Sequence, residues 1–288
     1  MSFKDQVQKL AYKVGGAAKT IHDREVVVKR LASQLQCSNI QIKDIKFLKS
    51  KHIEIYIQSR LTDDGIGKRT ALNEMACIRA VLREAGHNKL ADSDRLSNSS
   101  LDIGGASREG TKTAMPNEMF RERLSFIDNI NSGVGSCMML ERLLGLRGEE
   151  AVQSVKSLET WVKDLEHGDK IRVIYGTKGG RPRDTHVVHV GRAKEAILLA
   201  IERTKKNGGW LIDRPDLKTA MNHYSYILRS NGFTGQYSPH CMRYAYARDR
   251  YNTYLKQGFT VHESLAMTSM DLGHGDGRGA YVKKVYLK

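Results

Sequence analysis

The sequence predicts a mainly α-helical protein of two domains, with one small β-hairpin in the second domain. Apolar residues recur at helical spacing through the first 90 residues and again after residue 117, and a polar stretch separates these two regions. One pair of β-rich segments interrupts the second region. A chain of 288 residues is long enough to build two modest hydrophobic cores.

Residues 1–90 are predicted to form the first, wholly helical domain. Apolar side chains recur every three or four residues over 21–35 and 72–82, and another apolar series occupies residues 40–61. Asp63-Asp64-Gly65 supplies a break before the last helix. We therefore expect a bundle of three or four short amphipathic helices.

Residues 91–116 are predicted to be a linker between the two domains. Ser, Asn, Gly and Thr dominate this stretch, and no hydrophobic period survives in it. The second domain is therefore expected to span residues 117–288.

The second domain is predicted to begin with two helices, the first over residues 118–130. The next helix is strongly apolar and leads into Gly145-Leu146-Arg147, which would hold an arginine at the edge of the core. Glu150 follows three residues later, within reach to brace that guanidinium.

A β-hairpin is predicted next, with strands over residues 170–175 and 185–190. The turn between them is rich in glycine and basic residues, and it contains Lys178 and Arg181, with Arg183 just beyond. Helices over residues 192–205 and 216–230 follow as scaffold.

The net charge of +15 indicates a polyanionic partner, since such an excess of Lys and Arg is costly unless it is neutralised. No stretch approaches the roughly 18 apolar residues of a membrane-spanning helix, and the first ten residues lack a signal-peptide core. We therefore expect a cytoplasmic, nucleoid-associated protein that binds double-stranded DNA and no membrane. The candidate DNA contacts are Lys68, Arg69, Arg79, Arg181 and Arg183.

Near the C-terminus, two histidines, an arginine and two tyrosines gather in a short segment. Ser238-Pro239 predicts a helix start, with Ser238 as the cap. His240 and Arg243 then lie three residues apart on one helix face, where an imidazole and a guanidinium can both reach a phosphate.

Taken in order, these residues resemble the tyrosine recombinases, the phage-integrase family. The resemblance rests on Gly-Leu-Arg at 145–147, the hairpin lysine, His-x-x-Arg at 240–243, Leu-Gly-His at 272–274 and a closing tyrosine. It implies an N-terminal SAM-like core-binding domain, a C-terminal catalytic domain, and cleavage and rejoining of DNA strands through a 3′-phosphotyrosyl intermediate without cofactor or metal. An integrase of a mobile element is the expected identity, and a catalytically impaired, architectural DNA-binding relative is the alternative.

The resemblance also implies a role for each site residue. Arg147 and Arg243 would grip the scissile phosphate, Lys178 would protonate the departing 5′ oxygen, and Glu150 would brace the site. His240 would assist proton transfer with the nucleophile. His274 would hydrogen-bond the phosphate.

Two tyrosines remain candidates for the nucleophile. Tyr281 is seven residues beyond His274 and Tyr286 is twelve beyond it, and neither matches the family's spacing without a gap. Val285 and Ala280 lie before Tyr286 at the family's apolar positions, so we favour Tyr286, with Tyr281 as the alternative. Two residues follow Tyr286, so we expect no C-terminal docking helix and a multimer that assembles on DNA.

Overall fold

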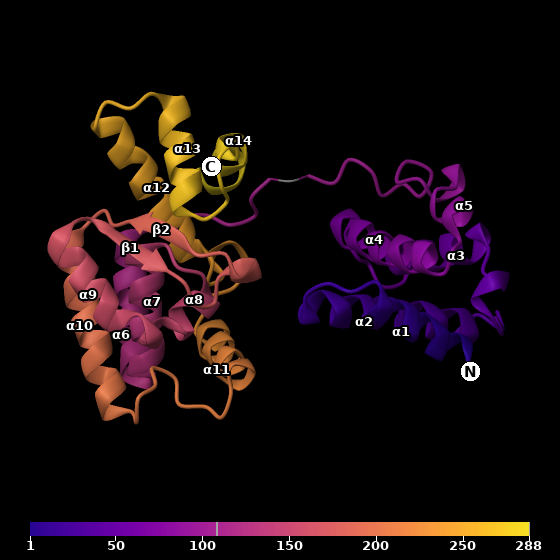
Figure 1. The fold of residues 1–288 in the computed structure, drawn as a ribbon, viewed down its shortest axis with the longest axis horizontal. Helices are drawn as coiled ribbons and strands as arrows, with labels where there is room; N and C mark the ends of the chain where they lie inside the picture. The colour runs from indigo at the N-terminus through magenta and orange to yellow at the C-terminus, as the bar shows by residue number, and fades with distance from the viewer. Residues whose placement is uncertain (108, 288) are drawn as a thin grey trace. The chain divides into compact units, whose positions relative to one another are not determined.

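The computed structural model describes residues 1–107 and 109–287 of the chain (Figure 1). The chain divides into two compact units, and the boundary follows Ser107. Each unit has its own hydrophobic core. No helix within the described residues is long and apolar enough to cross a membrane.

The N-terminal unit is a helical bundle, as the apolar spacing predicts. Its elements are α1 (Phe3–Lys13), α2 (Ala18–Cys37), η1 (Ile45–Phe47), α3 (Ser50–Thr62), α4 (Lys68–Glu84), α5 (Asn88–Ala91) and η2 (Asp94–Leu96). Helix α1 packs along α2, and both contact α4. Their apolar faces form one core, which includes Leu31, Ile53 and Met75.

The stretch expected as a linker is in part packed. Ala91, Leu96, Leu101 and Ile103 are buried in the core of the N-terminal unit. These few apolar side chains are enough to pack the stretch against the helical bundle. They do not recur at helical or strand spacing, so the sequence gives no sign of this packing. The structural boundary therefore falls after residue 107, later than the expected domain end at residue 90.

A buried charge cluster joins three helices of this unit. Glu74 on α4 accepts hydrogen bonds from the Arg60 guanidinium at 2.7 Å and from the Tyr56 hydroxyl at 2.7 Å, both on α3. Arg30 on α2 donates to the same carboxylate at 2.7 Å. Burial alone would raise the pKa of Glu74, but the hydrogen bonds from Arg60 and Tyr56 lower it overall, so the carboxylate is ionised at neutral pH.

We expect Glu74→Ala to lower the free energy of opening of the N-terminal unit by about 3 kcal/mol, because it removes the buried anion of Arg60 and leaves that guanidinium only the half-exposed Asp64. Hydrogen exchange at the amides of α3 and α4 in the full chain measures this. Glu84→Ala, at the exposed end of the same helix, is the matched control and should change protection by no more than about 0.5 kcal/mol. Unchanged protection in the Glu74 variant would show that the cluster carries no stability.

The C-terminal unit is mainly helical with one small sheet, as the sequence predicts. Its helices and strands are α6 (Asn117–Ile130), α7 (Ser132–Leu144), α8 (Gly148–Val152), α9 (Leu158–His167), β1 (Lys170–Val173), β2 (Arg183–His186), α10 (Val190–Lys206), α11 (Leu217–Ser230), α12 (Cys241–Lys256), α13 (Val261–Asp271) and α14 (Gly279–Tyr286). Three single turns, η3 (Ser154–Lys156), η4 (Lys178–Gly180) and η5 (Gly235–Tyr237), complete it.

Helix α7 is the central element of this unit. It is apolar on nearly all sides, which is typical of a helix buried all round, and it packs against α6, α10 and α12. Gly145 ends it in the left-handed conformation at φ 63°. A Cβ at that position would lie 2.3 Å from the ring of Tyr246, so only glycine fits, and Leu146-Arg147 is delivered directly to the core edge.

Strands β1 and β2 pair antiparallel, with Val173 opposite Arg183 and Lys170 opposite His186. The second strand begins two residues earlier than expected and ends at His186. Its inward positions are Arg183 and Thr185, which are buried although polar, so the apolar pattern placed the strand too late. Figure 1 shows α12, α13 and α14 grouped beside this hairpin, and α13 contacts β2.

Candidate active site

A cavity of about 650 Å³ in the C-terminal unit brings together most of the residues singled out in the sequence. Its lining includes Arg147, Lys178, Arg181, Arg183, His240, His274, Tyr281 and Tyr286. These residues come from the end of α7, the hairpin loop, the start of α12, the turn after α13 and helix α14. The lining is strongly basic, which suits an anionic ligand.

Glu150 forms the centre of the site. Its carboxylate accepts a bond from the Arg147 backbone N–H at 2.7 Å and from the Arg147 guanidinium at 2.7 Å. The expected bracing of Arg147 by Glu150 is therefore present in the geometry. The same carboxylate also accepts two bonds from Arg183, at 2.5 and 2.7 Å.

Glu150 is an ionised carboxylate inside the protein. Burial by itself would raise its pKa, but the hydrogen bonds and charge of Arg183, followed by the charge of Arg243, lower the pKa to about 2. Three guanidinium cations around one carboxylate leave two uncompensated positive charges in the site.

Arg243 lies beneath the cavity rather than on its surface, because its side chain is fully buried. Its two terminal nitrogens donate to the backbone carbonyls of Gly145 and Leu272. Burial, with Arg183 and Arg147 nearby, lowers the pKa of Arg243 to about 10, which still leaves it charged at neutral pH. The role of Arg243 in binding a phosphate stays a prediction, and its guanidinium lies among backbone carbonyls under the cavity.

Tyr286 lies between the two histidines. Its hydroxyl is 3.3 Å from Nε2 of His240 and 3.1 Å from Nε2 of His274. Tyr286 is 3% exposed, and its ring also packs on Tyr244 at a centroid distance of 4.5 Å. A phenol that contacts two neutral imidazoles can donate its proton to one of them and accept a bond from the other.

Both imidazoles favour the neutral form. Desolvation, with the charges of Arg243 and Arg147, lowers the pKa of His274 to about 3. The same causes lower the pKa of His240, although part of that residue is exposed. At neutral pH both rings can therefore accept a proton.

Tyr281 is placed differently from Tyr286. It is 37% exposed, and its ring meets the edge of the His274 ring at a centroid distance of 5.1 Å. Of the two tyrosines, Tyr286 is the one whose hydroxyl lies within hydrogen-bond distance of both histidines among the described residues.

Helix α12 starts later than Ser238-Pro239 predicts. Its first residue is Cys241, and His240 precedes it with helical dihedral angles. The Cys241 N–H donates to the Ser238 carbonyl at 2.7 Å, so a tight turn leads into the helix. His240 and Arg243 still lie one turn apart.

Helix α14, which carries Tyr281 and Tyr286, is held by the segment that enters the C-terminal unit. The Gly110 N–H donates to the Lys284 carbonyl at 3.4 Å, and Ala114 is buried with Val285 and Tyr286. A Cβ at Gly110 would lie 2.1 Å from the Val285 carbonyl oxygen, so this crossing requires glycine.

Sequence reading missed Arg278 and misjudged Arg183. Arg278 lines the cavity from the glycine-rich loop before α14, which gave no periodic signal. Arg183 was expected as a DNA contact, but it is 8% exposed and engaged with Glu150. Arg183 and Thr185 are two residues apart on β2, so their side chains lie on the same, buried face of the strand. This period-two spacing is the signal that could have identified Arg183 as a buried residue.

The basic candidates of the N-terminal unit bind the chain itself. Lys68 pairs with Asp102 at 2.7 Å, and Arg69 donates to the Ala106 carbonyl at 2.8 Å. Arg79 donates to the Leu96 carbonyl at 2.6 Å. These bonds fasten the segment after α5 to helix α4.

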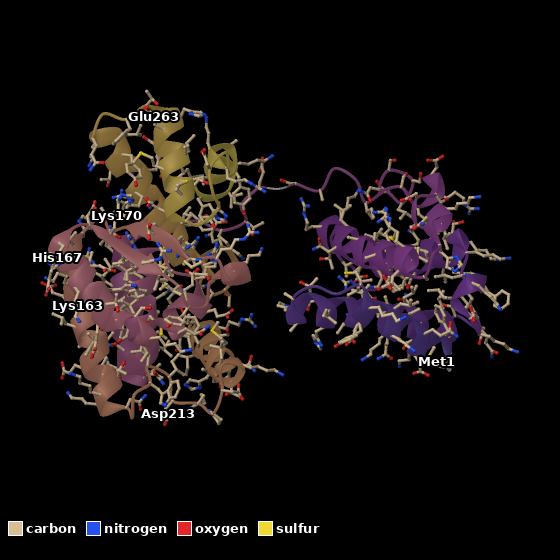
Figure 2. The ribbon with its side chains drawn as sticks, viewed as in Figure 1. Met1, Lys163, His167, Lys170, Asp213 and Glu263 are labelled. Atoms are coloured by element: carbon tan, nitrogen blue, oxygen red, sulfur yellow. The ribbon has the colours of Figure 1, made fainter. Side chains whose placement is uncertain are left out.

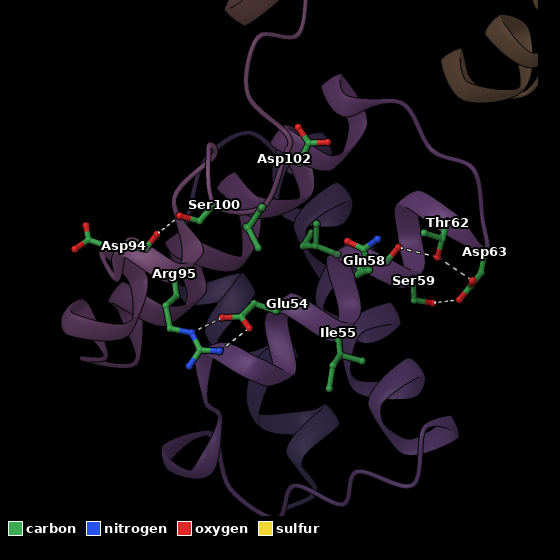
Figure 3. A pocket seen from close by; sticks show the side chains of 12 residues that line it. Glu54, Ile55, Gln58, Ser59, Thr62, Asp63, Asp94, Arg95, Ser100 and Asp102 are labelled. Carbon is green, nitrogen blue, oxygen red and sulfur yellow. Dashed lines mark hydrogen bonds and ion pairs between the residues drawn. The ribbon is translucent and has the colours of Figure 1, made fainter.

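Two other cavities are unsuited to binding an anion, because carboxylates line them. The larger, of about 850 Å³ in the N-terminal unit, has an acidic lining in which Glu54 pairs with Arg95, and Asp63 accepts from Ser59 (Figure 3). The smaller, of about 490 Å³, lies where α9 meets β1, at Lys163, His167 and Lys170 (Figure 2). Three aspartates also line it: Asp164, Asp169 and Asp184.

Two integrase family models match the chain. Residues 102–249 match the family model described as "Integrase", and residues 1–91 match the model described as "Phage integrase, N-terminal". The first match alone covers just over half of the chain, so the chain belongs to the integrase family. This agrees with the tyrosine-recombinase motifs in its sequence.

Solved structures of integrases share the fold. The Tn1549 transposon integrase in complex with transposon right end DNA is 14% identical, with a TM-score of 0.58 over 98% of this chain and 94% of that chain. The lambda integrase tetramer bound to a Holliday junction is 16% identical, with a TM-score of 0.59 over 96% and 75%. No curated protein sequence is significantly similar to this chain.

We expect the C-terminal unit to lose stability as the pH falls below about 6.5, because His240 and His274 are held neutral in the fold and gain protons on unfolding. Their contribution is fully present above that pH, and Glu150 adds a further loss below about 4.5. Both tryptophans, Trp161 and Trp210, lie in this unit, so their fluorescence reports its melting.

Between pH 7.5 and 5.5 the fall in melting temperature should be smaller for the His240→Gln/His274→Gln variant than for the unmodified chain. His262→Gln, at an exposed position on α13, is the matched control. An equal fall in all three proteins would contradict the neutral state of these two histidines.

Proposed function

We propose that this chain is a site-specific DNA recombinase in which Tyr286 attacks the scissile phosphate and forms a 3′-phosphotyrosyl intermediate. One observation carries the assignment: the Tyr286 hydroxyl lies within hydrogen-bond distance of both His240 and His274, on the wall of a cavity shared with Arg147 and Lys178. The family shown by the sequence supports this chemistry.

Nucleophile activation is assigned to the two histidines. A phenol with a pKa of about 10 needs a base at neutral pH, and a neutral imidazole at 3.1 to 3.3 Å can take its proton as the oxygen bonds to phosphorus. The lowered pKa values keep both rings in the basic form, and the ring that does not accept the proton can donate a hydrogen bond.

Leaving-group protonation is assigned to Lys178. As the new bond from the tyrosine oxygen to phosphorus forms, the bond to the 5′ oxygen breaks, and that alkoxide needs a proton to depart. Lys178 is exposed in the hairpin loop and lines the same cavity. Rejoining reverses these transfers, so the bond energy is conserved and no nucleotide cofactor is required.

Charge stabilisation is divided between two arginines. The Arg147 side chain is 22% exposed and faces the cavity, where it can bind a non-bridging oxygen. Arg243 acts from beneath, with its buried positive charge and its hold on the Gly145 and Leu272 carbonyls. Fixed charges of this kind cost no reorganisation when the transition state forms.

Double-stranded DNA is the proposed partner. The net charge of +15 favours a polyanion, and the Tn1549 and lambda integrases of the same fold are solved on DNA. We assign the protein to a mobile element, with assembly as a multimer on its DNA sites and a location at the nucleoid. Arg181, exposed at the cavity rim, is the favoured backbone contact of the hairpin.

Covalent capture tests the assignment. The full chain is incubated with nicked duplexes that carry a random central region, and SDS-resistant protein-DNA adducts are amplified over several rounds. We expect adducts with the unmodified protein and with Tyr281→Phe, and background levels with Tyr286→Phe, because only Tyr286 is hydrogen-bonded by both histidines.

Tyr281→Phe serves as the matched control, since it removes a hydroxyl from the same helix. An adduct that survives Tyr286→Phe and disappears with Tyr281→Phe would move the nucleophile to Tyr281. DNA binding by the unmodified protein with no adduct at all would favour the architectural alternative.

A further inference from the structure

We propose that Arg183 is a positioning residue for strand cleavage, which fixes the Lys178 loop to the Arg147 side of the active site through Glu150 and to the His274 side through the Asp271 carbonyl. The inference rests on the proposed role of Lys178 as the acid that protonates the 5′ oxygen. It assigns a function to a side chain that was expected to contact DNA and that lies inside the protein instead.

The first contact ties the hairpin to the arginine site. Arg183 is the first residue of β2, directly after the loop that carries Lys178. Its two terminal nitrogens donate to the two oxygens of Glu150 at 2.5 and 2.7 Å, with its side chain 6% exposed. A bidentate pair of this kind fixes direction as well as distance.

The second contact ties the same guanidinium to the turn that carries His274. Arg183 Nε donates to the Asp271 carbonyl at 3.0 Å, and Thr185 donates to that carbonyl at 3.0 Å. Gly273 lies directly against the arginine stem, since a Cβ there would be 2.7 Å from Arg183 Cδ. One side chain therefore joins the hairpin, helix α8 and the turn after α13.

The other end of the loop lies directly against the same helix. Gly176 has φ +72°, and a Cβ on it would lie 2.7 Å from the backbone of Glu149. The loop that carries Lys178 thus runs between two points on α8: Gly176 packs against the helix at the start of the loop, and Arg183 is hydrogen-bonded to it at the end. Lys178 is exposed, so its position depends on these two anchors.

Direct phosphate binding by Arg183 does not fit this geometry. Its Nε and both terminal nitrogens already donate to acceptors inside the protein. Releasing Glu150 from Arg183 would leave a buried carboxylate short of its cation, which is costly.

A bridging-sulfur substrate separates positioning of the acid from other roles. In a duplex with sulfur in place of the 5′ oxygen at the scissile phosphate, the departing thiolate has a conjugate acid with a pKa of about 8.5 and leaves without protonation. Loss of a well-placed acid therefore slows cleavage of the oxygen substrate and spares the sulfur substrate. Both duplexes carry the DNA sequence that is recovered in the covalent-capture experiment.

We expect Arg183→Gln to slow single-turnover cleavage of the oxygen substrate by about 10²-fold, the lower range for a lost general acid, and to leave cleavage of the sulfur substrate within a few-fold of normal. Lys178→Ala should show the same selectivity. The double variant should be no slower than Lys178→Ala, because both changes remove one function.

Arg172→Gln is the matched control on the same hairpin. Arg172 pairs with Asp184 at 3.1 Å, with both side chains 59% exposed, so its loss should change both rates by less than about twofold. If tryptophan fluorescence shows that Arg183→Gln does not fold, Arg183→Lys replaces it. That variant should slow cleavage less, with the same selectivity, because lysine keeps the positive charge but loses the two-pronged hydrogen bonding of the guanidinium.

Equal slowing of both substrates by the Arg183 variants would overturn the proposal, and so would oxygen-substrate cleavage at the normal rate. These outcomes leave the proposed function intact, since the unmodified protein still cleaves. Failure of the unmodified protein to cleave either duplex would instead contradict the proposed function itself.

Discussion

The active site depends on one buried carboxylate. Glu150 holds Arg147 through both its backbone and its guanidinium, binds Arg183 by two hydrogen bonds, and lies 4.0 Å from Arg243. A single anion allows three cations to gather in a small space, and their excess positive charge remains available to a phosphate. Without that anion the arginines would repel one another, and burying them would be unfavourable.

The rest of the site is built onto this centre by backbone groups. The carbonyl of Gly145 accepts bonds from Arg243 and Arg183, and the carbonyl of Leu272 accepts bonds from Arg243 and Arg147. Leu272 lies in the turn that presents His274, so the arginine cluster and the histidine share one support. Tyr286 then fits against His274 and His240, which places the proposed nucleophile beside the cationic cluster.

The sequence predicted the elements that follow a period or a motif. Helical spacing identified the N-terminal bundle, and the residues Arg147, Glu150, His240 and His274 were placed because their motifs are short and local. The preference for Tyr286 rests on its apolar neighbours, of which Val285 is buried and Ala280 is exposed. Interactions between distant segments, such as Arg183 with Glu150 and Gly110 with Val285, could not be predicted, because they produce no periodicity or motif in the local sequence. Burial of a charge is decided by its partner, and the partner is known only from the fold.

Peptide mapping of the covalent DNA adduct is the most direct measurement of the central claim that Tyr286 is the nucleophile. After nuclease treatment, trypsin separates the two candidates, because Lys283 and Lys284 lie between them: Tyr281 falls in the peptide of residues 279–283 and Tyr286 in that of residues 285–288. The account predicts a nucleotide attached to the peptide that contains Tyr286. A nucleotide on the peptide that contains Tyr281 would contradict it.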